Sequence, residues 1–314
     1  MKKTFCLALI LALLAGCAPF APALAEGTPR VVCTIFPLYD WARAVAGQEA
    51  IELTLLLDNG VDLHSFQPTA QDIMEIAGCD LFIYVGGESD AWVEDALKEA
   101  VNPNQAALSL LDAMEDPMEE EAVEGMQAGE ACAPEETEYD EHIWLSLRNA
   151  RALTATIADA FSQLDPAHAD AYRANAEAYA ARLAALDDAY AEAVAGARIH
   201  TMLFGDRFPF RYLAEDYGLS CYTAFSGCSA ETEASFETIV FLAGKVDELG
   251  LPAVLTIENS DRRVAETIAQ AAQGSPAVLT LDSMQATTAR DIESGATYLG
   301  IMEDNLSVLR KALN

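Results

Sequence analysis

The sequence predicts an α/β protein in which two doubly wound parallel-sheet lobes are joined by one long backbone helix. Two observations predict this architecture. Residues 165–196 keep a helical repeat of apolar side chains and have no Gly or Pro in their interior. On both sides of that stretch, short apolar runs alternate with helical patterns, which is typical of parallel sheets covered on both faces.

The central stretch, residues 165–196, is expected to form one uninterrupted connecting helix. Asp165 suits the N-cap, Pro166 suits the first turn, and Gly196 suits a left-handed position after the last turn. At about 1.5 Å per residue, such a helix is roughly 45 Å long and can run the height of a domain. An ordinary surface helix within one domain is the alternative. The apolar stripe consists of Tyr172, Tyr179, Leu183, Leu186, Tyr190 and Val194.

Each lobe is expected to alternate strands and helices. In the N-terminal lobe, residues 30–164, we expect strands at Val31–Ile35, Ile51–Leu57, Leu81–Val85 and Ala106–Leu111, and helices at Leu38–Ala46, Thr69–Ala77 and Ser89–Glu99. In the C-terminal lobe, residues 197–314, we expect strands at Ile199–Phe204, Leu219–Thr223, Ala253–Ile257 and Ala277–Leu281, and helices at Phe208–Tyr217, Phe236–Leu249, Arg262–Gln273 and about Ile292 to Leu313. Ligands of such sheets bind beyond the carboxyl ends of the strands, so a cleft between the lobes is the expected site.

The first residues have the parts of an export signal. Residues 1–16 combine two Lys, a short apolar run and small residues, and the run is too short to span a membrane. The segment ending at Cys17 resembles the lipobox of bacterial lipoproteins, which predicts lipidation of Cys17 and an extracytoplasmic protein anchored to the membrane. Residues 17–29 would then form a tether. Plain secretion with cleavage nearer Ala25 is the alternative.

Charge and cysteine content restrict the partners. The formal net charge is −32 at pH 7, which disfavours nucleic acid and anionic lipid and suits a cation. The acidic segment, residues 115–141, contains no Lys or Arg and is expected to be a mobile loop. It is either a solvated charge run or a weak collector of cations. Besides Cys6 and Cys17, five cysteines remain, and Cys221 with Cys228, or Cys33 with Cys79, can form a disulfide.

Side chains suited to a metal ion follow the predicted strands of both lobes. His64 lies in GVDLHSFQP, just beyond a strand, and His142 lies in YDEHIWLS, where the acidic segment re-enters the fold. Asp206, Glu258 and Asp282 stand at the matching positions in the C-terminal lobe. Taken singly, each has an ordinary structural role as an alternative, such as a helix cap. Together, two imidazoles and two carboxylates form a shell that accepts Zn²⁺ or Mn²⁺.

Several motifs resemble the zinc and manganese solute-binding lipoproteins of bacterial ABC transporters. They are HSFQP, EYDEHIWLS, the connecting helix, FRYLAEDYGL and the tail that begins LDSMQ. The resemblance covers essentially the whole chain after the signal. It implies two α/β lobes joined by a rigid helix and a metal cleft between them.

The resemblance also implies a ligand set. His64 and His142 match the first two ligands of the family, and Asp282 falls where many members use an acidic fourth ligand. The third position of the family falls on Arg207 or its neighbour, so Asp206 is the candidate. Further candidates are Glu258, and Cys228 or Glu231 in GCSAETEAS, which departs from the family pattern.

The implied function is capture of one divalent ion, Zn²⁺ or Mn²⁺ as bound substrate, by a monomer that delivers it to an ABC permease. No enzymatic activity is expected. A lipid-anchored adhesion or interaction protein is one alternative. A metallohydrolase is the other, and it would need an open coordination position and a nearby general base. The sequence contains no HExxH motif.

Overall fold

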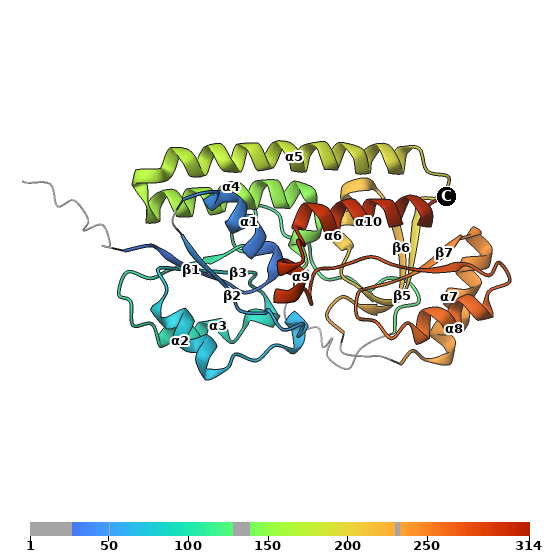
Figure 1. Cartoon of the computed structure of the whole chain (residues 1–314). Coiled ribbons are helices and arrows are strands. Elements are labelled where there is room, and N and C mark those ends of the chain that lie inside the picture. The colour runs from blue at the N-terminus through green and yellow to red at the C-terminus, as the bar shows by residue number, and fades with distance from the viewer. Residues whose placement is uncertain (1–26, 50, 128–138, 230–232) are drawn as a thin grey trace, which may run out of the picture.

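Two parallel four-stranded sheets lie side by side beneath one long helix (Figure 1). The structure is a computed structural model, and it describes residues 27–49, 51–127, 139–229 and 233–314. The expected signal, residues 1–16, Cys17 and most of the tether lie outside the described residues. The α/β class and the two-lobe architecture are confirmed.

The first sheet forms the centre of the N-terminal lobe. Its strand order is β2-β1-β3-β4, and all pairs are parallel. Strands β1 and β3 are buried on both faces, as continuous apolar runs require. The strands are β1 (Arg30–Cys33), β2 (Glu52–Leu55), β3 (Leu81–Tyr84) and β4 (Ala106–Ser109), and the helices are α1 (Phe36–Ala46), α2 (Ala70–Gly78), α3 (Val93–Lys98) and α4 (Leu147–Leu164). Helix α4 is an element that the sequence analysis did not predict.

The second sheet repeats this arrangement in the C-terminal lobe. Its order is β6-β5-β7-β8, again with parallel pairs. The strands are β5 (Thr201–Phe208), β6 (Ser220–Ser226), β7 (Ala253–Thr256) and β8 (Ala277–Thr280), and the helices are α6 (Arg211–Tyr217), α7 (Phe236–Leu249), α8 (Arg263–Ala271), α9 (Ala289–Glu293) and α10 (Tyr298–Ala312).

The connecting helix is α5 (Ala169–Ala195), which has 27 residues and runs above both sheets (Figure 1). All six residues of the predicted apolar stripe are buried, packed against α1, α4 and α10. Asp165 and Gly196 stand at the predicted ends, Asp165 before a 3₁₀ turn (Pro166–His168) that leads into α5, but neither has the predicted capping geometry. The Asp165 carboxylate accepts hydrogen bonds from the His168 imidazole and the Tyr172 hydroxyl instead of capping the helix, and Gly196 keeps a right-handed conformation.

Two predicted element boundaries were also wrong. Strand β5 continues to Phe208, with a register shift between Phe204 and Arg207, so Asp206 lies within an irregular strand rather than after it. Gly205 permits this path because a Cβ there would lie 2.4 Å from the Ala265 Cα. The closing helix is divided into α9 and α10 at Gly295, which has a φ of +100° that side chains disfavour.

Helix α10 returns from the C-terminal lobe and packs against the N-terminal one. The Tyr298 backbone N–H donates to Asp40 in α1 at 2.9 Å, and its hydroxyl donates to the Trp144 carbonyl at 2.6 Å. These buried bonds fix the two lobes relative to each other at the base of α10.

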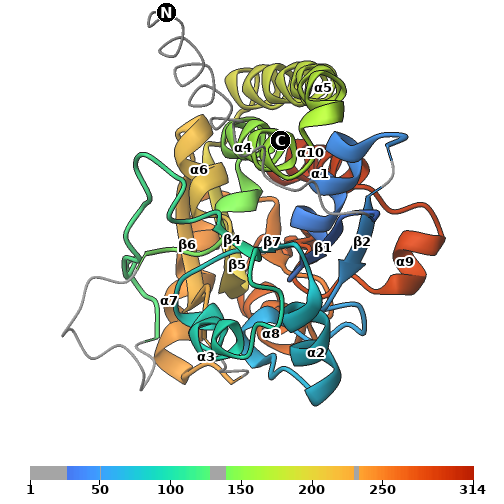
Figure 2. The same ribbon diagram turned by 90° about the vertical axis from the view of Figure 1, so that its left-hand side faces the viewer.

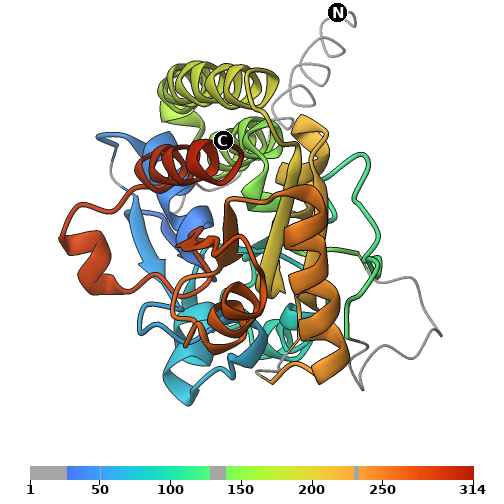
Figure 3. The ribbon, with the colours of Figure 1, turned by 90° about the vertical axis from the view of Figure 1, so that its right-hand side faces the viewer.

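The described start of the acidic segment crosses from one lobe to the other. After β4 it runs beside β6 and α7, as the two end views show (Figures 2 and 3). The Gln127 N–H donates to the Ala224 carbonyl at 3.0 Å, and the Met118 N–H donates to the Tyr212 hydroxyl at 3.0 Å. Residues 128–138 lie outside the described residues.

Among the described residues, no helix has the length and apolar character needed to cross a membrane. Of the five cysteines that follow Cys17, four are described. All four carry free thiols, so neither candidate disulfide forms. The fifth, Cys132, lies outside the described residues.

Candidate metal centre

His64 is presented on a short turn beyond β2. The Asp62 carboxylate caps this turn by accepting the His64 backbone N–H at 3.0 Å. On the ring, Nδ1 lies 2.6 Å from the Ser89 hydroxyl. Ser89 in turn donates its backbone N–H to the buried Glu141 carboxylate at 2.7 Å. The bond between Nδ1 and the Ser89 hydroxyl holds the ring and leaves Nε2 facing His142.

His142 is fully buried at the end of the acidic segment, just before a 3₁₀ turn. Asp140 accepts both its backbone N–H at 2.8 Å and its ring Nδ1–H at 2.9 Å. A carboxylate can only accept, so Nδ1 carries the proton and Nε2 presents a lone pair. Such a carboxylate fixes the orientation of a metal-binding imidazole and makes it more basic.

The Nε2 atoms of the two rings face each other. Nε2 of His64 lies 3.1 Å from Nε2 of His142. Two imidazole nitrogens bound to one tetrahedral Zn²⁺ at 2.0–2.1 Å would lie about 3.3 Å apart. Because two facing lone pairs repel each other, a proton on one ring or a shared metal ion is needed to stabilise them.

The two rings of the pair differ in basicity. Burial, followed by the charge of His142, lowers the pKa of His64 to about 3. Burial also lowers the pKa of His142, but the charge and hydrogen bond of Asp140, then the charges of Glu120 and Glu141, outweigh it and raise the pKa above its usual value. A proton taken up by the pair therefore goes to His142.

The Cys228 loop covers the other side of His142. A Cβ on Gly227 would lie 2.8 Å from the Cε1 atom of His142, so the backbone of this loop touches the ring. The pKa of the half-buried Cys228 thiol is raised by burial and then by Glu120, Glu141 and Asp140. The charges of the same three carboxylates act on the His142 ring.

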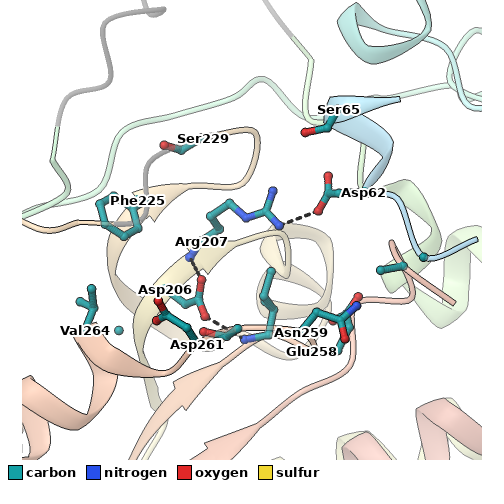
Figure 4. Close-up of a pocket in the computed structure, with 15 residues that line it drawn as sticks. Asp62, Ser65, Asp206, Arg207, Phe225, Ser229, Glu258, Asn259, Asp261 and Val264 are labelled. Atoms are coloured by element: carbon teal, nitrogen blue, oxygen red, sulfur yellow. Dashed lines mark hydrogen bonds and ion pairs between the residues drawn. The ribbon is translucent and has the colours of Figure 1, made fainter. Parts of the chain in front are cut away.

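A cavity of about 390 Å³ lies between the lobes, and its lining includes Asp62 and Ser65 from the turn that carries His64 (Figure 4). Arg207 extends from β5 across this cavity and pairs with Asp62 at 2.6 Å. The ion pair joins the turn that carries His64 to the C-terminal lobe. Its positive charge also acts on His64 and contributes to lowering the pKa of that ring. The charged residues of the lining are Asp62, Asp206, Arg207, Glu258 and Asp261.

The three candidate carboxylates of the C-terminal lobe have other partners. Asp206 accepts the backbone N–H of Arg207 at 2.9 Å and of Ile257 at 3.3 Å. Glu258 accepts from Ser283 and Gln285, and burial, followed by Asp282, raises its pKa to about 7. Asp282 accepts the Met284 N–H at 2.8 Å.

The structure thus brings His64 and His142 together. Among the described residues, no group of three or more His, Cys, Asp and Glu side chains lies close enough together to hold a metal ion. The roles of Asp206, Asp282, Glu258 and Cys228 as ligands stay predictions, and Glu231 lies outside the described residues. Sequence reasoning missed Asp140, Glu141 and Ser89, which orient the two rings. Asp140, two positions before His142, could have been predicted from the sequence as the partner of that ring. Ser89 could not, because it reaches His64 only through the tertiary fold.

Known proteins resemble this chain in sequence and in fold. The family described as ZnuA, zinc-uptake complex component A, periplasmic, matches residues 31–312. The zinc-binding lipoprotein AdcA of Streptococcus pneumoniae is 31% identical over 291 residues, which are 91% of this chain and 56% of that protein. The chain therefore spans little more than half the length of this curated relative.

Two solved structures share the fold. The Zn(II)-bound ZnuA-like domain of Streptococcus pneumoniae AdcA is 26% identical, with a TM-score of 0.74 and coverage of 91% of this chain and 99% of that one. The laminin-binding protein Lmb of Streptococcus agalactiae, described as bifunctional with adhesin and metal-transporting activity, is 25% identical, with a TM-score of 0.75 and coverage of 92% and 100%. The family match over nearly the whole chain confirms the resemblance seen in the motifs, and the protein belongs to the ZnuA family of zinc-uptake complex components.

Proposed function

We propose that the protein captures a Zn²⁺ ion outside the cytoplasm and delivers it to an ABC permease. The observation that carries this proposal is the imidazole pair, with two Nε2 atoms 3.1 Å apart and each ring oriented through its Nδ1. Family membership and the zinc-bound structure of the AdcA domain support zinc as the substrate. Elemental analysis of the purified protein, followed by competition between zinc and manganese, tests the proposal.

We propose Cys228 as the third ligand. Its loop touches His142, whereas Asp206 and Asp282 are engaged by backbone N–H groups in this structure. A metal ion deprotonates the thiol that it binds, so the raised pKa of Cys228 does not prevent coordination. A thiolate ligand favours zinc strongly over manganese, while a shell completed by Asp206 and Asp282 would accept manganese as well.

Cys228→Ser is expected to weaken zinc binding by about 100-fold, because one of four ligands of a structural-type site contributes on the order of 3 kcal/mol. Protein loaded with Co²⁺ should lose its sulfur-to-cobalt charge-transfer band in the near ultraviolet. Cys221→Ser is the matched control, since Cys221 lies on β6 with its thiol 3.9 Å from the Leu219 carbonyl. If Cys228→Ser kept both the band and the zinc affinity, Cys228 would not be a ligand, and Asp206 and Asp282 would again be the preferred candidates.

Arg207→Gln is expected to tighten zinc binding by about 3- to 10-fold, on the order of 1 kcal/mol. The positive charge of the guanidinium acts on His64 and neutralises the charge of Asp62. Both effects oppose the binding of a zinc cation at His64. A competition titration with a chromophoric chelator measures the change. Arg263→Gln, an exposed arginine of the same lobe that pairs with Asp261, is the control and should bind zinc like the unaltered protein. Weaker binding in Arg207→Gln would show that the ion pair supports the site.

The delivery step requires a membrane location and a partner. We propose that Cys17 carries a lipid anchor and that the monomer docks on the permease of a metal importer. The name lipoprotein of the AdcA relative supports the anchor, and the family description as an uptake component, rather than an enzyme, supports the permease. Radiolabelled fatty acid incorporation that is lost in Cys17→Ala would test the anchor.

Adhesion is a second candidate function. The similar fold of Lmb, a protein described as both adhesin and metal transporter, favours it. Binding of the purified protein to immobilised laminin, compared with and without zinc, would test this activity separately from metal capture.

A further inference from the structure

The acidic segment turns one carboxylate inward. Its start runs beside its end, because Glu119 forms an antiparallel bridge with Tyr139 and the Asp140 N–H donates to the Met118 carbonyl at 2.8 Å. Successive side chains of an extended chain point to opposite sides. Accordingly, Glu119 and Glu121 are exposed, whereas Glu120 between them is partly buried.

The inward carboxylate lies at the imidazole pair. It accepts the backbone N–H of Gly227, and a Cβ on Gly227 would lie 2.8 Å from the His142 ring. The charges of Glu120 and His142 act on each other, and Glu120 is the carboxylate that acts most on the Cys228 thiol. Glu120 thus approaches the His142 ring through Gly227.

One oxygen of this carboxylate has no partner in the described part of the protein. Glu120 Oε2 is buried and makes no hydrogen bond, and Oε2 of Glu141, a residue only 2% exposed, is in the same state beside His64. Burying a carboxylate oxygen without a partner destabilises a protein unless a cation or a donor compensates it. Of the two, Glu141 Oε2 lies 3.9 Å from Nδ1 of His64 rather than beside the facing Nε2 atoms, so Glu120 is the unpaired carboxylate left to compensate a cation bound by the imidazole pair.

We propose that Glu120 supplies a carboxylate oxygen to the metal ion captured by His64 and His142. The acidic segment is then part of the metal centre and not only a solvated charge run. This inference rests on the proposed function, since it adds a ligand to the same site.

Glu120→Gln tests the inference because it keeps the shape of the side chain and the acceptor for Gly227 while removing the charge. Zinc affinity should fall by about 10- to 100-fold. Manganese affinity should fall further, because a hard cation depends more on carboxylate oxygen. Glu119→Gln removes the same charge one residue away on the exposed side and should bind both metals like the unaltered protein.

Cobalt spectroscopy separates a ligand from a distant charge. In Co²⁺-loaded Glu120→Gln protein, the visible d–d bands should change, while any sulfur charge-transfer band of Cys228 stays. Equal losses for zinc and manganese with unchanged d–d bands, or binding indistinguishable from Glu119→Gln, would overturn the inference. A loss in His142→Ala with none in Glu120→Gln would overturn only this inference, whereas unchanged zinc binding in His142→Ala would overturn the proposed function itself.

Discussion

Replacing His142 by alanine is expected to lower zinc affinity by about 100- to 1000-fold, or on the order of 3–4 kcal/mol, because one of the proposed ligands of the ion is removed. His64→Ala should have an effect of similar size, since the two Nε2 atoms share one position 3.1 Å apart. Isothermal titration calorimetry with a competing chelator measures both losses.

His200→Ala is the control for these two variants, because His200 is exposed on the loop before β5. Circular dichroism should show that all three variants keep the fold. The assignment of the site would be refuted if either site variant bound zinc as tightly as His200→Ala does.

Zinc affinity is expected to fall steeply as the pH decreases. Below the raised pKa of His142, zinc must displace the proton that this ring holds. A second proton leaves Cys228 when its thiol binds the ion as we propose, because burial raises the pKa of that thiol. The logarithm of the binding constant should therefore rise by about two per pH unit below the pKa of His142 and by about one above it. Competition titrations between about pH 5 and 8, where histidine titrates, measure the slope.

Asp140→Asn tests whether the titration of His142 causes the change in slope. Asp140 raises the pKa of His142 through its charge and its hydrogen bond, so the amide should move the change in slope to lower pH. Calorimetry in buffers of different ionisation enthalpy counts the released protons directly. A slope of one at every pH would show that His142 is neutral in the metal-free protein, and a slope of zero above its pKa would exclude the thiol.

Local patterns were sufficient to predict the lobes. The buried strands β1 and β3 are continuous apolar runs, and the stripe of α5 repeats at helical spacing, so periodicity and burial coincide. The start of this helix was harder to predict. Asp165 bonds to His168 and Tyr172 instead of capping the helix, because its side chain has competing partners that no local pattern reveals.

The residues of the candidate site were likewise predicted only in part. His64 and His142 stand out in the sequence because each lies in a distinctive motif. His64 follows a predicted strand, and His142 lies where the acidic segment re-enters the fold. Asp206 was expected at the end of a strand, but the strand continues past it with a bulge, and its carboxylate is occupied by neighbouring backbone N–H groups. Strand length near a bulge depends on pairing with β6, which is a long-range contact.

The sequence by itself determined the α/β class, the connecting helix, the acidic character and the two imidazoles, because these follow from residue type and from the spacing of neighbours along the chain. Only the tertiary structure decided that the rings face each other, that Ser89 and Asp140 orient them, and that Glu120 and the Cys228 loop lie beside them. The physical reason is that metal capture needs donors within a few ångströms of one point. Residues 64 and 142 are 78 positions apart in the sequence and reach such a point only when the N-terminal lobe has packed.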